Sequence, residues 1–89
     1  MAYEEIEEPI AVQALFEEGG PARGGAQGLK PLAFLWRGRR YPVEQVRFRW
    51  QTRDGRATLH FFALVADGQA CELSFRNDDL TWRLEKIWQ

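Results

Sequence analysis

The stretch "WRGRRYPVEQVRFRW", residues 36–50, decides how this chain is expected to fold. Toward its end, Val46, Phe48 and Trp50 alternate with basic residues. A period of two is typical of a β-strand with one buried face. Gly38 lies near the start of the stretch, where it favours a turn. The stretch therefore predicts the end of one strand, a turn, and a second strand that runs antiparallel to the first.

The spacing of apolar residues changes within the second of these strands. Val43 and Val46 are three residues apart, whereas the apolar residues after Val46 are two apart. This change predicts a β-bulge near Glu44–Gln45, where one extra residue would bend the strand.

The rest of the chain carries further strand and turn signals on both sides of this stretch. Residues 10–16 also fit a helix that begins after Pro9, but their period is closer to two, and we favour a strand. Asp67–Gly68 is the strongest hairpin signal in the sequence. The expected strands cover residues 10–16, 32–38, 41–51, 57–66, 69–75 and 80–88.

These signals predict an all-β fold: a strongly bent antiparallel meander of about six strands, forming a small open barrel-like sheet. The chain has 89 residues, and we expect a single domain over residues 1–89. Residues 19–30 are rich in glycine and offer little to bury, so we expect a mobile loop that is dispensable for folding.

The charge of the chain is unevenly distributed. The net charge is −1, but residues 1–22 carry six glutamates and no basic residue, whereas residues 23–56 carry nine basic and two acidic residues. A basic surface of this kind can bind an anion, or the acidic segment can lie against it. The lone cysteine and the acidic N-terminus, which does not resemble a secretion signal, favour the cytoplasm, and no apolar run suits a membrane.

The aromatic residues are expected to form most of the core. On the predicted strands, Phe48 and Trp50 share a face with Val46, so we expect them to be buried. Trp36 is expected to join them, as are Phe34, Leu80, Trp82 and Leu84. Tyr41 and Trp88 are the aromatic residues that we expect to find exposed.

The arginines would then occupy the opposite face. Arg47 and Arg49 alternate with the core residues, and the other arginines of the stretch lie at or beside the turn at Gly38. Arginine binds phosphate and stacks on bases, so this hairpin is a candidate nucleic-acid surface. Its candidate residues are Arg37, Arg39, Arg40, Tyr41, Arg47 and Arg49. The alternative is that these arginines only solvate the sheet and pair with carboxylates.

Few residues suit catalysis. His60 is the only histidine and Cys71 the only cysteine, and both lie in apolar strands where a structural role is expected. Asp78 and Asp79 fall in a predicted turn and suit turn hydrogen bonds. We therefore expect no enzyme activity, no catalytic residues, no metal, no cofactor and no small-molecule substrate.

Three motifs give the chain a family resemblance. They are a Pro-x-x-Phe-x-Trp-Arg-Gly-Arg-x-Tyr-x-Val-x-x-Val core from Pro31 to Val46, an Asp-Gly-x-x-x-Glu-Leu hairpin from Asp67, and a terminal Trp-x-Leu-x-x-x-Trp from Trp82. They resemble a small uncharacterised bacterial all-β domain, similar to C-terminal modules that accompany relatives of Y-family DNA polymerases. The resemblance implies an all-β fold and no known activity, and the association with these polymerases favours a role in DNA repair or translesion synthesis without assigning one.

Two functions remain open from the sequence. The first is a non-enzymatic accessory or interaction module that acts through protein contacts and self-associates as a two-fold dimer, with the sheet edges and Trp88 as its contact surface. The second is a nucleic-acid-binding module that uses the arginine-rich hairpin over residues 36–50. The two differ in whether the arginines face open solvent or carboxylates.

Overall fold

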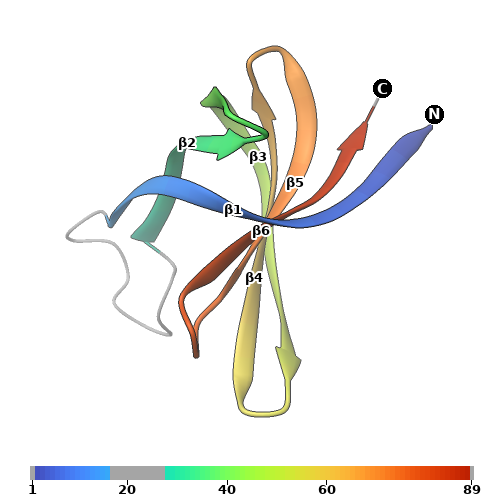
Figure 1. Ribbon diagram of the computed structural model, residues 1–89. Coiled ribbons are helices and arrows are strands. Elements are labelled where there is room, and N and C mark those ends of the chain that lie inside the picture. Colours follow the sequence, from blue (N-terminus) through green and yellow to red (C-terminus); the bar gives the residue numbers. More distant parts are fainter. Residues whose placement is uncertain (1, 17–27, 89) are drawn as a thin grey trace.

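The computed structural model describes residues 2–16 and 28–88, which form six antiparallel strands in the order of the chain (Figure 1). The all-β meander expected from the sequence is confirmed. Its strands are β1 (Tyr3–Phe16), β2 (Leu29–Trp36), β3 (Arg39–Asp54), β4 (Ala57–Ala66), β5 (Gln69–Arg76) and β6 (Thr81–Trp88). Across these two ranges, no helix has the length and apolar composition needed to cross a lipid bilayer.

The first and last strands pair and close the sheet into a ring. β1 begins at Tyr3, seven residues earlier than expected, and its acidic first half pairs with β6 from Tyr3 opposite Trp88 to Ile10 opposite Trp82. The expectation that Trp88 is exposed is therefore wrong, because Trp88 lies within this strand pair. Its ring is half-buried and contacts the ring of Tyr3.

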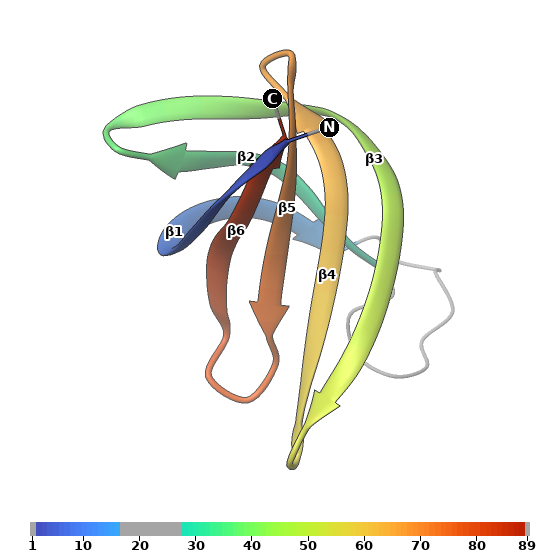
Figure 2. The ribbon, with the colours of Figure 1, turned by 90° about the vertical axis from the view of Figure 1, so that its right-hand side faces the viewer.

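The ring is not regular, because β2 and β3 soon diverge. They pair only from Ala33 opposite Pro42 to Trp36 opposite Arg39. Beyond Pro42, β3 bends away and runs beside β4 to the hairpin at Asp54 (Figure 2). The part of the expected mobile loop that the structure describes, residues 28–30, includes the start of β2 at Leu29, which is buried in the core. Residues 19–27 of that loop lie outside the described residues.

Two bulges, not one, shape β3. The first falls between Val43 and Gln45, as the sequence predicts, and the second falls between Val46 and Phe48. The second bulge inverts the alternation of side chains, because one inserted residue moves all later residues to the opposite face. The prediction that Phe48 and Trp50 are buried was therefore wrong.

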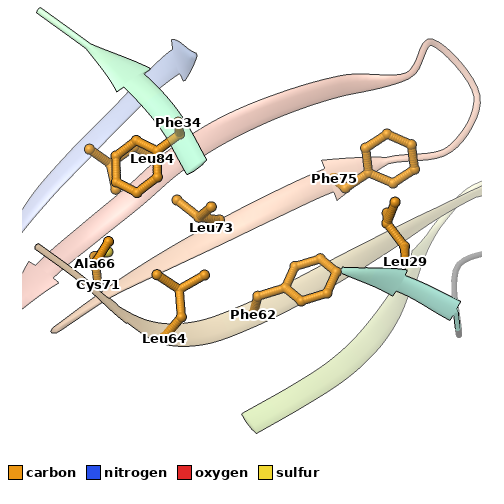
Figure 3. Packing of buried hydrophobic residues seen from close by; sticks show 9 residues of the cluster. All are labelled: Leu29, Phe34, Phe62, Leu64, Ala66, Cys71, Leu73, Phe75 and Leu84. Atoms are coloured by element: carbon orange, nitrogen blue, oxygen red, sulfur yellow. The ribbon is translucent and has the colours of Figure 1, made fainter. Parts of the chain in front are cut away.

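The core lies between the two halves of the ring (Figure 3). β4 supplies its centre through alternate residues, and the Phe62 side chain is 1% exposed. Figure 3 shows Leu29, from the start of β2, beside Phe62 and Phe75. The buried apolar cluster consists of Leu29, Phe34, Phe62, Leu64, Ala66, Cys71, Leu73, Phe75 and Leu84. Of the expected core residues, Phe34 and Leu84 are confirmed, Trp36 and Trp82 are half-buried against the cluster, and Leu80 is exposed.

Short turns connect the strands from β2 to β6. Arg37 and Gly38 both have positive φ angles, of 52° and 78°, and so do Asp67 and Gly68, at 51° and 75°. Two-residue hairpin turns of type I′ have positive φ at both positions, and their twist matches that of the paired strands. The hairpins predicted at these two sites are therefore confirmed, and they hold β2 against β3 and β4 against β5.

Candidate interaction surface

The outer side of β3 and β4 carries an exposed apolar surface. Trp50 lies opposite Phe61 in the register, and their rings stack with centroids 5.3 Å apart and planes 6° apart. Phe48 lies opposite Ala63 on the same side and is 71% exposed, while Trp50 is 41% exposed. We call this surface the outer aromatic face, and it consists of Phe48, Trp50, Leu59, Phe61 and Ala63. Leu59, Phe61 and Ala63 are half-buried, so the two residues from β3 stand furthest into solvent.

Arg37, the first predicted site residue, is held by an acidic residue of β1. Its guanidinium donates a 2.9 Å hydrogen bond to Glu8 Oε2 and lies over the ring of Trp36. Trp36 Nε1 donates to the other oxygen of Glu8, also at 2.9 Å. The hydrogen bond from Arg37 lowers the pKa of Glu8 below its ordinary value, and the bond from Trp36 adds to the shift. The acidic N-terminal segment therefore does contact the basic hairpin, as one sequence interpretation expected.

Arg39 and Arg40 are also engaged. Arg39 forms an ion pair with Asp67, and its guanidinium lies over the ring of Tyr41. Arg40 donates a long hydrogen bond of 3.4 Å to Gln13 Oε1. Tyr41 is half-buried and stacks on Phe34 with centroids 5.1 Å apart, so its ring belongs to the edge of the core and is not an open stacking platform.

The second bulge separates the surroundings of Arg47 from those of Arg49. Arg49 lies opposite Phe62, on the inner side of the sheet. Its guanidinium lies 5.1 Å from the centre of the Phe62 ring and donates to the carbonyl oxygen of Leu29. The prediction that Arg49 points away from the core was wrong, for the same reason that Phe48 was misplaced. Arg47 is exposed and forms no ion pair with any described residue.

The predicted site is therefore not one continuous cationic surface. Arg37 and Arg39 pair with carboxylates, Arg40 donates a hydrogen bond to Gln13, Arg49 faces inward, and Arg47 remains exposed next to Phe48. Arg53 and Arg56, toward the β3–β4 hairpin, are exposed and form no ion pair within the described part of the chain. Sequence reasoning did not single them out, although both belong to the basic middle segment.

The residues that the sequence analysis considered for catalysis lie in the core or in a turn. His60 is buried, and its pKa is lowered first by burial and then by the charge of Arg49. Burial raises the pKa of the Cys71 thiol to about 12, which makes the thiolate scarce at neutral pH. Asp79 accepts hydrogen bonds from the backbone and the hydroxyl of Thr81, as expected for turn chemistry.

Comparison with known proteins places the chain in a family without a described role. Residues 1–69 match a family described as a domain of unknown function, DUF6504, and the chain belongs to this family. No curated protein matches the chain. No solved structure matches it either.

Proposed function

We propose that this DUF6504 protein is a non-enzymatic interaction module that binds another protein through its outer aromatic face. The exposure of Phe48 and Trp50 on one face supports this proposal most directly. Aromatic residues and arginine are enriched where proteins meet, and a cluster of exposed apolar side chains is often functional. The burial of His60 and Cys71 supports a non-enzymatic role, and the free thiol of Cys71 suits the cytoplasm.

The simplest partner is a second copy of this chain. A two-fold contact would place the outer aromatic face of one copy against that of another, because such interfaces use the same patch twice. Sedimentation equilibrium at micromolar concentration should then give a dimer mass for the native protein and a monomer mass for Phe48→Ser. A monomer mass for both proteins excludes self-association and leaves a different protein as the partner.

Photo-crosslinking in cells tests that second case. A photoreactive amino acid placed at position 48 should capture a partner, and the same amino acid at position 80 should not. Leu80 is a matched control, because it is 70% exposed but lies in the turn between β5 and β6 and does not belong to the outer aromatic face. Equal capture at both positions, or none at position 48, contradicts the proposal.

Nucleic-acid binding is the second candidate function, because Arg47 lies exposed next to Phe48 and Trp50. Single strands bind where bases stack on exposed aromatic rings beside cationic groups. Such a role would fit the resemblance to modules that accompany relatives of Y-family polymerases, in DNA repair or translesion synthesis. This version of the hypothesis moves the binding surface from the turn at Gly38 to the outer aromatic face.

Fluorescence anisotropy with single-stranded DNA, duplex DNA and RNA at two salt concentrations tests this candidate. The affinity should fall with salt, by about 0.7 logarithmic units per unit of log salt for each phosphate contact on a single strand. Arg47→Gln and Trp50→Ala should both weaken binding. The double variant Glu8→Gln with Asp67→Asn, which releases Arg37 and Arg39, should strengthen binding only if the turn contributes.

A further inference from the structure

β3 has a free edge along most of its length. Within the described residues, β3 pairs with β2 only over Arg39–Pro42, and from Val43 to Asp54 it pairs only with β4. The opposite edge of β3 over residues 43–54 therefore presents alternate backbone N–H and C=O groups that no described strand satisfies. We call this the β3 edge. Edges of this kind are templates for an added strand.

The β3 edge borders open space. Where β2 and β3 diverge, a groove of about 340 Å³ is lined by Lys30 from β2 and by Glu44, Gln45, Val46 and Arg49 from β3. Within the described residues, the side chain of Arg49 reaches across this gap and donates to the carbonyl oxygen of Leu29. Within the described part of the chain, this groove leaves room beside residues 44–49 of β3 for the backbone of another chain.

The charges along this edge select what can pair with it. Lys30, Arg47 and Arg53 are exposed basic residues of the two strands that border it. Glu44, an acidic residue at the start of the edge, accepts a hydrogen bond from the backbone of Gly68. Like charges that meet across strands are destabilising, so the β3 edge disfavours an identical edge from a second copy. An extended segment with acidic side chains is favoured, because opposite charges that meet across strands are stabilising.

We propose that the β3 edge binds an acidic, extended peptide segment of a partner protein, which adds to the sheet as a seventh strand. This inference rests on the proposed function, because it describes how the partner of the outer aromatic face is held. Backbone hydrogen bonds to β3 supply affinity. Acidic side chains pair with Arg47 and Arg53, and apolar residues of the segment pack beside Phe48.

Three synthetic peptides of about seven residues, a common strand length, test the proposal. The first alternates Glu and Val, the second alternates Lys and Val, and the third is the Glu–Val peptide with N-methyl-valine at its centre, which blocks strand pairing. Binding is followed by nuclear magnetic resonance of the native protein, together with amide hydrogen exchange. The Glu–Val peptide should bind and slow exchange within residues 43–54, and the other two should bind at least about tenfold more weakly, a difference of about 1.4 kcal/mol.

Charge reversal provides the matched variants. Arg47→Glu combined with Arg53→Glu should weaken the Glu–Val peptide about tenfold and strengthen the Lys–Val peptide. Arg56→Glu is the control, because it makes one of the same substitutions in the turn between β3 and β4, outside the edge. Thermal unfolding of each variant confirms that the fold is retained.

Four results would overturn this inference. Alternate amides of residues 43–54 could all be protected from exchange in the free protein, which would mean that the edge is already covered. The Glu–Val peptide could fail to bind, or the N-methylated peptide could bind equally well. A single-stranded DNA oligomer could bind the same residues more tightly than the Glu–Val peptide, which would favour the nucleic-acid candidate. Capture at position 48 without any edge binding would remove this inference and leave the proposed function standing. Edge binding without capture would contradict the proposed function, and with it the claim that the bound segment belongs to the partner of the outer aromatic face.

Discussion

A single inserted residue decides which side chains of β3 face the solvent. Before the second bulge, Val46 lies opposite Leu64 on the inner side, and after it Phe48 lies opposite Ala63 on the outer side. Arg49 thereby comes to lie on the inner side, where it contacts Phe62 and reaches the backbone of Leu29. The same bulge therefore places an arginine beside the core and two aromatic residues in solvent.

The titration of His60 reports the position of Arg49. Because burial and then Arg49 lower the pKa of His60 from its ordinary value of 6.5, nuclear magnetic resonance of this lone imidazole should give a pKa below 6.5. The unfolded chain takes up this proton first as the pH falls, so the free energy of unfolding should decrease below about pH 6.5. Replacement Arg49→Gln should raise the pKa of His60.

Arg47→Gln is the control for that titration, because Arg47 is exposed and does not contribute to the shift of His60. If Arg47→Gln moves the pKa of His60 as much as Arg49→Gln does, the inward position of Arg49 is wrong.

The reactivity of Cys71 gives a second measurement at this scale. With a buried thiol whose pKa is about 12, alkylation by iodoacetamide at pH 8 should be slow in the native protein and rapid in urea. Mass spectrometry of samples taken over time measures both rates. Rapid alkylation without denaturant would show that the pocket around Cys71 opens in the native state.

At the scale of elements, local signals were sufficient for most of the fold. The turns at Gly38 and Asp67–Gly68 and the first bulge of β3 depend on nearby residues, and each was predicted. The first half of β1 was missed because its glutamates have low β-propensity and its pairing with β6 joins the two ends of the chain. The second bulge was missed because the spacing of Val46, Phe48 and Trp50 stays at two and gives no sign of it.

The start of β2 shows how a core residue escapes notice at the end of a glycine-rich segment. Leu29 is 3% exposed, so Leu29→Ala should lower the free energy of unfolding by about 2–5 kcal/mol. Its exposed neighbour in β2 is the control, and Lys30→Ala should change stability by less than about 0.5 kcal/mol. Urea denaturation of both variants measures the difference. A loss of unfolding free energy for Leu29→Ala as small as that for Lys30→Ala would show that Leu29 belongs to the expected loop and not to the core.

At the scale of the whole molecule, some charged groups of the surface are paired within the chain, while other charged and apolar groups face the solvent. The closure of β1 against β6 brings Glu8 to Trp36 and Arg37, so part of the positive charge of the hairpin is matched within the chain. Phe48, Trp50 and Arg49 were predicted on the wrong faces of β3, since burial depends on the register of β3 with β4. Phe48 and Trp50 are exposed together on the outer aromatic face, and the exposed Arg47 precedes Phe48 in the sequence.

The central claim is that Phe48 belongs to this exposed face and not to the core, and urea unfolding of Phe48→Ala beside Phe62→Ala tests it most directly. Phe62 is 1% exposed and Phe48 is 71% exposed, and the two lie on strands that pair with each other. Phe62→Ala should cost about 3–5 kcal/mol, as loss of a buried phenylalanine does. Phe48→Ala should cost less than about 1 kcal/mol, because it opens no cavity. A loss of 3 kcal/mol or more for Phe48→Ala, about that of a core residue, would contradict the account.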